Sequence, residues 1–299
     1  MIAIRRIAIG FTAALLVGAL ALGGLVAAWF AGVRIPLASG TTYMQIQQIA
    51  SADAAGSPSG TFFIALIGTD FRPGVGGHRP DALHLVGVNP TTNTATMLNV
   101  PRDTCWRGGK INRATGEDGP RDPANALGEL IGVPVTYAIS VDFAGFTGIV
   151  DGMGGVQINV PIAMNDHNSG AVFSPGEQRI NGGQALALSR DRHDFPRGDI
   201  TRSENQGLVI IAGLRTLQAE AKGAMGEFKT LATLGRHARL DGLSVQDAYR
   251  LARIAQGIDP ATVRNVTIPV GGGSGCLGLG GGAGALFADF ADDATLQTH

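Results

Sequence analysis

Charged residues, aromatic residues and cysteines are all scarce in this chain of 299 residues. Charged residues make up 16% and the formal net charge is -1, so no basic face stands out and we expect no nucleic-acid partner. Only two cysteines, Cys105 and Cys276, are present, and neither a C-x-x-C pair nor a Cys/His zinc pattern occurs. The length still allows one large buried core or two modest ones.

Familiar motifs of nucleophilic, nucleotide-binding and zinc enzymes are also missing. The sequence has no G-x-S-x-G turn, no G-x-x-x-x-G-K-[ST] loop and no H-E-x-x-H helix. Its six histidines show no metal-ligand spacing, and we interpret His84 and His193 as ordinary polar contacts. None of these three enzyme classes is therefore indicated.

One long apolar run lies near the N-terminus. Arg5 and Arg6 precede residues 7–33, which contain no charged side chain. Roughly 20 apolar residues cross a bilayer as a helix, so residues 1–33 are predicted to be a cytoplasmic start and a single transmembrane anchor. The two arginines predict a cytoplasmic N-terminus, with the rest of the chain outside the cell membrane. A cleaved signal peptide with a small-residue site at residues 37–39 is the alternative.

Segments typical of strands and helices alternate after the anchor. Residues 34–60 indicate a linker with room for one short helix, and nine glycines within residues 271–284 predict a loosely ordered tail at residues 271–299. Between them, residues 61–270 are typical of a layered α/β domain. Strands are expected at 62–67, 82–88, 95–100, 135–141, 156–160 and 263–270, and helices at 122–130, 143–153, 182–189, 199–223 and from 243 onward.

A predicted hairpin brings two charged residues together. A turn signal at residues 89–93 joins two strands, with Asp81 entering the first and Arg102 leaving the second. Because the far ends of an antiparallel pair are adjacent, Asp81 is expected beside Arg102.

Ionic groups gather between residues 184 and 206. Four arginines lie here, Arg190, Arg192, Arg197 and Arg202, directly after an apolar run. They form either a surface ion-pair cluster or a site for a planar polyanion, because guanidinium groups match carboxylate or phosphate two bonds at a time. Arg202 and Gln206 are four residues apart and share one helix face.

Two aspartates support a metal-binding hypothesis. Asp70 follows the first strand of the domain and Asp81 begins the second. Mg²⁺ prefers a few oxygen ligands together with water and substrate phosphates, although turns and helix caps are the commoner reason for two such aspartates. Metal and arginines together are typical of phosphoryl transfer, which depends on positioning and charge neutralisation.

The two cysteines suggest a disulfide. In an exported chain, Cys105 and Cys276 can pair and would hold the tail near the strand that bears Arg102. Two unrelated buried thiols are the alternative.

A series of short motifs occurs in the order found in the LytR-CpsA-Psr family, which the chain resembles over about residues 62–215. The motifs are Asp70 after Ile67-Gly68-Thr69, then Arg79-Pro80-Asp81-Ala82-Leu83, Asn89-Pro90, Val100-Pro101-Arg102-Asp103-Thr104, Lys110-Ile111-Asn112, Val141-Asp142-Phe143-Ala144-Gly145-Phe146, Asp151-Gly152-Met153-Gly154-Gly155-Val156, Pro175-Gly176, Asn181-Gly182-Gly183-Gln184-Ala185-Leu186, Arg190-Asp191-Arg192 and Gly198-Asp199-Ile200-Thr201-Arg202-Ser203-Glu204-Asn205-Gln206.

This resemblance implies a three-layer α/β/α domain with a mixed central sheet and a hydrophobic tunnel for a lipid. It also implies transfer of a glycopolymer from a polyprenyl-pyrophosphate carrier to a peptidoglycan hydroxyl. By position, Asp70 and Asp81 would hold Mg²⁺ or Mn²⁺, and Asp103 would serve either as the base or as a support for Arg102. The pyrophosphate would be bound by Arg79, Arg102, Arg190, Arg192, Arg202 and Gln206.

Departures from the family pattern leave these proposed ligands in place. Pro80 and Ala82 stand where the family commonly has Ser and Thr, which bears on acceptor choice and rate. The same residues would also serve a pyrophosphatase that uses water, or a non-catalytic regulator that binds the lipid carrier. Arg197 matches no motif and is assigned to the surface. Three acidic residues are expected to hold the arginines in place, namely Asp191, Asp194 and Glu204.

Overall fold

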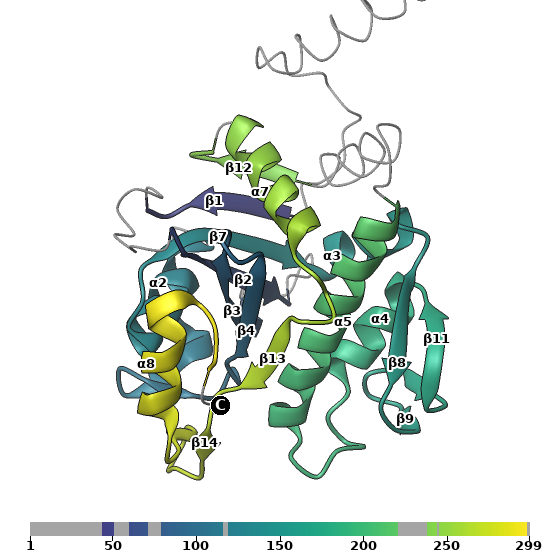
Figure 1. The fold of residues 1–299 in the computed structure, drawn as a ribbon. Coiled ribbons are helices and arrows are strands. Elements are labelled where there is room, and N and C mark those ends of the chain that lie inside the picture. Colours follow the sequence, from purple (N-terminus) through teal and green to yellow (C-terminus); the bar gives the residue numbers. More distant parts are fainter. Residues whose placement is uncertain are drawn as a thin grey trace, which may run out of the picture. The chain divides into compact units, whose positions relative to one another are not determined.

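The computed structural model describes residues 44–50, 60–70, 79–115, 119–220, 238–243 and 245–297. In this part of the chain, seven strands form one mixed sheet in the order β12-β1-β7-β2-β3-β4-β13 (Figure 1). Three neighbouring pairs are parallel, β12–β1, β7–β2 and β4–β13, and the others are antiparallel. The strands are β1 (Met44–Gln48), β2 (Phe62–Thr69), β3 (Pro80–Asn89), β4 (Thr94–Asn99), β7 (Val135–Asp142), β12 (Ala238–Asp241) and β13 (Arg264–Thr267).

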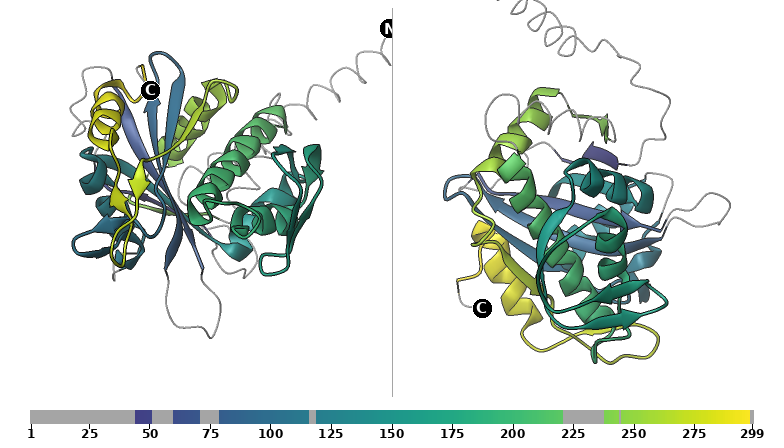
Figure 2. Two further views of the ribbon diagram at one scale, coloured as in Figure 1. Left: turned by 90° about the horizontal axis from the view of Figure 1, so that it is seen from below. Right: turned by 90° about the vertical axis from the view of Figure 1, so that its right-hand side faces the viewer.

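Helices cover both faces of this sheet. Alternate residues of β2 point to opposite sides, and apolar side chains on both sides pack against helices. Phe63 and its alternate neighbours pack with Leu127 of α2 (Arg121–Ile131) and Phe290 of α8 (Ala283–Asp293). Phe62 and Ile64 face α5 (Asp199–Glu220) and α7 (Val245–Gly257) in a separate cluster. Figure 2 shows α8 on one side of the sheet and α5 and α7 on the other. The predicted layered α/β domain with a mixed sheet is therefore confirmed.

A smaller lobe packs against α5. It consists of α3 (Phe143–Gly152), β8 (Val156–Val160), β9 (Met164–Asp166), β10 (Ala171–Phe173), β11 (Gly176–Ile180) and α4 (Gly182–Arg190). Strand β8 pairs with β11, and β9 with β10. The lobe has its own hydrophobic core, which includes Val156 and Leu188 and reaches Val209 of α5. Asn181 caps α4, and Gln184 completes a capping box.

The prediction that residues 34–60 form a linker is wrong at Met44–Gln48, which form strand β1. Met44 and Ile46 pair with Val141 and Ile139 of β7, so β1 is a strand of the central sheet. The sequence Met-Gln-Ile-Gln-Gln has a weak strand signal, and pairing with β7 and β12 overrides it. The compact unit accordingly spans Thr41–His299 rather than beginning at residue 61.

The prediction of a loosely ordered tail at residues 271–299 is also wrong. The glycines build a short hairpin of β14 (Val270–Gly271) and β15 (Gly278–Leu279), and Gly282, with φ 85°, begins α8. Phe290 and Leu286 of α8 are 0% and 2% exposed in the core between α8 and the sheet. Glycine density was misleading because the apolar residues that hold this segment in place lie after the glycines.

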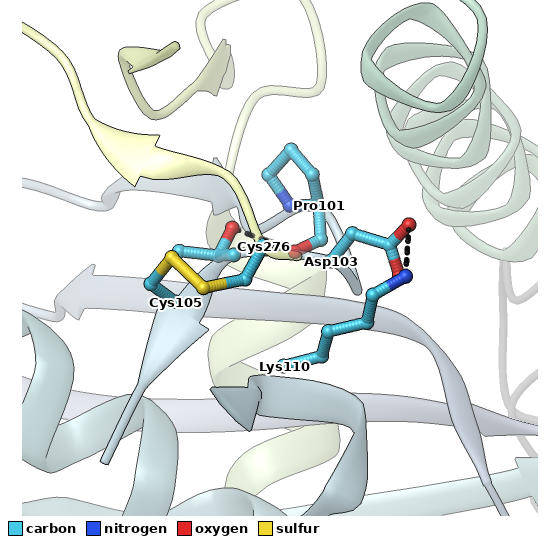
Figure 3. Close-up of a disulfide and its surroundings, with 6 residues drawn as sticks. Pro101, Asp103, Cys105, Lys110 and Cys276 are labelled. Atoms are coloured by element: carbon cyan, nitrogen blue, oxygen red, sulfur yellow. Dashed lines mark hydrogen bonds and ion pairs between the residues drawn. A yellow bond between two sulfur atoms is a disulfide. The ribbon is translucent and has the colours of Figure 1, made fainter. Parts of the chain in front are cut away.

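Cys105 and Cys276 form a disulfide between this C-terminal segment and the loop after Arg102 (Figure 3). Cys105 belongs to a small hairpin of β5 (Cys105–Trp106) and β6 (Gly109–Lys110). Backbone hydrogen bonds reinforce the link, since the N–H of Cys105 donates to Leu277 and the N–H of Leu277 donates to Asp103. The C-terminal segment thus supports the backbone beside Arg102.

No helix within the described residues is both long and apolar enough to span a bilayer. The predicted anchor at residues 1–33 lies outside the described residues.

Candidate active site

A cavity of about 370 Å³ lies between the central sheet and the small lobe. Leu66 and Ile139 line it from the sheet, while Phe146 and Leu186 line it from the lobe. A second, almost wholly apolar cavity of about 180 Å³ adjoins it, and both are lined by Leu66 and Ile210. Apolar walls therefore continue from the first cavity toward α7.

Four of the predicted arginines meet at this cavity, Arg102, Arg190, Arg192 and Arg202. Three of them share the carboxylate of Asp199, which is the first residue of α5. From the sequence alone, the position of Asp199 indicates only a helix cap. One oxygen of Asp199 lies 3.3 Å from Nη2 of Arg202 and 4.0 Å from Nη1 of Arg192. The other oxygen lies 3.5 Å from Nε of Arg102. Asp199 therefore joins arginines from three segments of the chain.

The arginine cluster still has hydrogen-bonding capacity. Arg202 is buried, at 7% exposure, yet within the described residues its Nε and Nη2 make no hydrogen bond. Nε of Arg102 also makes no hydrogen bond within the described residues. Its contacts with the carboxylates of Asp103 and Asp199 are ion pairs at 4.0 and 3.5 Å. An unpaired buried donor costs about 1–3 kcal/mol, and a charged one costs more. These donors are arranged to receive an anion with several oxygen atoms.

Electrostatics keep the cluster cationic. Burial lowers the pKa of Arg202, while Asp199 opposes this effect. Burial also acts to lower the pKa of Arg102, but Asp81, Asp199 and Asp103 outweigh it and raise the pKa overall. Arginine is protonated at physiological pH in either case.

The hairpin prediction is confirmed, because Nη1 of Arg102 donates to Oδ1 of Asp81 over 3.0 Å. Gly68 pairs with Ala82 and Thr69 with Pro80, so Asp81 is the extra residue of a β-bulge. A bulge turns its side chain away from the regular alternation of the strand. Here it places Asp81 at the cavity.

Asp70 and Asp81 both line the cavity, near the arginines. Their oxygens are the hard ligands that Mg²⁺ prefers. In the described ranges, no three His, Cys, Asp or Glu residues come together as a metal site. Two carboxylates facing a polyanion site still fit Mg²⁺, which keeps water and phosphate oxygens as its other ligands.

A buried polar network fixes α5, and with it Arg202 and Gln206, against the sheet. His84 contacts Oδ1 of Asn99 over 2.7 Å, and Asn99 donates to Asn265 over 2.7 Å. Asn265 in turn donates to the carbonyl of Glu204 in α5 over 3.1 Å. Gly207 permits this approach, because a Cβ there would overlap the side chain of Asn265. Burial lowers the pKa of His84 to about 4, against a smaller opposing effect of Asn99.

Gln206 joins these arginines at the cavity, and Arg190 makes a further contact there. Nε2 of Gln206 donates to the carbonyl of Ser189 over 3.1 Å, which ties α5 to α4. The guanidinium of Arg190 lies 5.3 Å from the ring centroid of Phe143, a cation–π contact. The structure thus places both residues in the cavity lining.

Two predicted residues have other surroundings. Arg79 is exposed, and its carbonyl accepts from the N–H of Asp70, but it does not line the cavity. Asp103 lies 3.0 Å from Nζ of Lys110 (Figure 3). It lies 4.0 Å from Nε of Arg102 and is also outside the cavity lining. This geometry favours Asp103 as a support for Arg102.

The prediction that Asp191, Asp194 and Glu204 hold the arginines of the cavity in place is wrong. Glu204 pairs instead with Arg197, with 2.6 Å between Oε2 and Nη2, on the surface. Asp191 and Asp194 accept backbone N–H groups, from His193 and Asn165 respectively. Asp81 and Asp199 take the expected role, because the turn before α5 brings Asp199 against Arg102. Its position at the start of a helix concealed this role in the sequence.

Comparisons with known proteins agree with this architecture. The LytR_cpsA_psr family model matches residues 38–278. The polyisoprenyl-teichoic acid–peptidoglycan teichoic acid transferase TagU of Bacillus subtilis (strain 168) is 36% identical over 155 residues, which cover 50% of each chain. The chain thus spans about half the length of the curated relatives it matches.

Solved structures show the same fold. A LytR-Csp2A-Psr enzyme from Actinomyces oris matches with a TM-score of 0.65 and 25% identity, over 79% of this chain and 92% of that one. TagV of B. subtilis matches with a TM-score of 0.64 and 22% identity, over 79% and 98%. With the family model covering most of its length, this chain belongs to the LytR-CpsA-Psr family.

Proposed function

We propose that this protein transfers a glycopolymer from a polyprenyl-pyrophosphate carrier to a hydroxyl group of peptidoglycan. The observation that carries the proposal is the buried Arg202, whose Nε and Nη2 make no hydrogen bond within the described residues and which lines a cavity with apolar walls. A ligand that fits both features has an anionic head of several oxygens and a long apolar tail. The adjoining apolar cavity supports this, because it extends the space available to the tail.

The relatives support the same class of reaction. TagU of B. subtilis is named a polyisoprenyl-teichoic acid–peptidoglycan teichoic acid transferase. Its matched half covers 155 residues of this chain. For the present chain we therefore propose an acidic glycopolymer as the transferred group.

The charged groups of the arginine cluster and the two metal-binding candidates each have a role in this reaction. The acceptor hydroxyl attacks the phosphorus that bears the glycan, the bond from this phosphorus to the bridging oxygen breaks, and polyprenyl phosphate leaves. Arg102, Arg190, Arg192 and Arg202 neutralise charge on the pyrophosphate, and Asp199 and Asp81 orient Arg102. Asp70 and Asp81 would hold Mg²⁺, which supplies further charge neutralisation when bound.

We also propose that residues 1–33 anchor the domain on the outer side of the cell membrane. The uncharged run at residues 7–33 and the preceding Arg5 and Arg6 support this orientation. Protease treatment of intact cells, followed by detection of a tag at each end, would test it. Loss of the C-terminal tag with retention of the N-terminal one is expected, and protection of both would contradict the proposal.

The test of the reaction uses the full-length chain with Mg²⁺, a synthetic polyprenyl-pyrophosphate disaccharide and uncrosslinked peptidoglycan strands. A phosphodiester between disaccharide and peptidoglycan is expected, and Arg202→Ala should reduce its formation by about 100-fold or more, the scale of losing one charge-stabilising donor. Arg197→Ala is the matched control, because Arg197 is an exposed arginine of the same segment that pairs with Glu204.

The other outcomes identify the alternatives. Release of disaccharide phosphate without the acceptor bond indicates a pyrophosphatase. Tight donor binding without turnover under Mg²⁺ indicates a carrier-binding regulator. Either result would overturn the proposed transfer.

A further inference from the structure

A histidine and an aspartate form a pair on the lobe side of the cavity. Asp166 ends β9, and His193 follows the end of α4 by three residues. Nδ1 of His193 lies 3.1 Å from Oδ2 of Asp166, and both residues line the cavity. The Asp166 side chain is 3% exposed, whereas that of His193 is 47% exposed. An imidazole at the cavity is thus held from behind by a buried carboxylate.

Hydrogen bonds fix the orientation of this imidazole. An ionised carboxylate only accepts, so Nδ1 of His193 carries the hydrogen and Nε2 of the neutral ring keeps a lone pair. The second oxygen of Asp166 accepts from the N–H of Asn168 over 2.9 Å. The backbone N–H of His193 donates to Asp191 over 3.1 Å. A base oriented by a second group is the usual arrangement for removing a proton from a hydroxyl.

The carboxylate that holds His193 stays ionised. Burial acts to raise the pKa of Asp166, but hydrogen bonds from His193, Asn168 and Ser169 outweigh it and keep the carboxyl ionised. Asp194 lies in the same loop, and its carboxylate accepts from Asn165 of β9.

Two further charged residues are neighbours of His193 in the sequence. Asp191, whose pKa is raised mainly by burial, lies near Asp166 and Asp194. Arg192 lines the cavity, where we propose that the pyrophosphate binds. His193 is therefore next to the charge that the donor brings to the cavity.

We propose that His193, positioned by Asp166, takes the proton from the acceptor hydroxyl. This inference rests on the proposed function. The hydroxyl oxygen forms the new bond to phosphorus, its proton passes to Nε2 of His193, and polyprenyl phosphate departs with the electron pair of the broken bond. Asp166 is a positioning residue. Asp103 is less suitable, because it is paired with Lys110 and lies outside the cavity lining.

The test compares three variants of the full-length chain in the donor and acceptor assay. His193→Ala should lower kcat by about 10²–10⁴-fold with little change in KM for the donor. His193→Asn should lose as much, because its amide can still donate to Asp166 but takes no proton. His167→Ala is the matched control, since His167 is an exposed histidine next to Asp166 that does not line the cavity.

Two readouts separate a base from a structural residue. Added imidazole should restore part of the activity of His193→Ala, and transfer by the unaltered chain should speed up as pH rises and the imidazole loses its proton. A variant that keeps the original kcat and pH profile would overturn the inference, as would a rate that falls with rising pH, which indicates a cationic phosphate ligand. An unaltered chain that forms no phosphodiester would overturn the proposed function, and this inference with it.

Discussion

Oδ1 of Asp199 lies 3.3 Å from Nη2 of Arg202, one turn further along α5. The same carboxylate reaches Arg102, which follows a strand of the central sheet. A single acidic residue thus holds the donors of two distant segments in one orientation.

Asp199→Asn should lower kcat for transfer by about 10–100-fold, because misplacement of a binding group by about 1 Å costs up to 10²-fold. Donor KM should change less, since the arginine charges remain. Steady-state kinetics would measure both. Glu204→Gln removes a half-buried carboxylate, paired with Arg197, from the same helix and should leave kcat unchanged. An Asp199→Asn variant with normal kcat would contradict the role of Asp199.

Asp70→Asn and Asp81→Asn should each raise the Mg²⁺ concentration that gives half-maximal transfer, by about tenfold or more. An amide binds Mg²⁺ more weakly than a carboxylate, which is the hard anionic ligand that this ion prefers. Titration of activity with MgCl₂ after EDTA treatment checks this. Glu177→Gln, an exposed carboxylate on β11, is the control. Unchanged Mg²⁺ dependence in both aspartate variants would rule out the metal site.

Cys105→Ser should destabilise the domain, because the disulfide closes a sequence separation of 171 residues. The expected loss is about 2–5 kcal/mol, visible as a lower midpoint in urea unfolding. Cys276→Ser and the double variant should show the same loss, since each removes the same bond. A wild-type midpoint that does not move on addition of dithiothreitol would contradict the prediction.

Phe290→Ala should cost about 3–5 kcal/mol of unfolding free energy, because the ring is 0% exposed between α8 and the sheet. The ring also packs closely on β3, since a Cβ added to Gly87 would lie only 2.9 Å from Cε2 of Phe290. Leu279→Ala, in the exposed hairpin at 46% exposure, should change stability little. Equal effects of the two substitutions would show that α8 is not part of the core.

The stability of the domain should fall between pH 6.5 and pH 4 as a result of His84. Burial lowers the pKa of His84 from 6.5 to about 4, so the unfolded chain binds a proton in this window that the folded chain does not. Stability from this group is therefore complete above pH 6.5 and decreases as pH falls, by about 3 kcal/mol at 1.36 kcal/mol per pKa unit. Urea unfolding at several pH values measures the slope, which His84→Gln should flatten. A slope that survives in His84→Gln would assign the effect to other groups.

Local patterns in the sequence predict much of the sheet and part of the site. The strand at residues 156–160 coincides with β8, and the cap at Asn181 is present with its capping box. These features depend on neighbours a few residues apart, which the sequence displays directly. The pairing of Asp81 with Arg102 was predictable for the same reason, because a turn signal alone joins the two strands.

Other features depend on partners that are remote in the sequence. β1 is a strand because β7 and β12 pair with it, and α8 is ordered because Phe290 finds a place on the sheet. Asp199 stands at a helix-capping position, which does not indicate its contact with Arg102. The neighbours of His193 along the chain likewise do not indicate its contact with Asp166.

Residue types at recognisable positions were enough to predict the family, the disulfide partners, and two carboxylates and four arginines that line the cavity. Tertiary packing was needed to establish which acidic groups orient the arginines and which carboxylate holds the imidazole of His193. Ion pairs and hydrogen bonds act over about 3–4 Å, and only the packing of α5 and the lobe against the sheet brings such distant residues within that range.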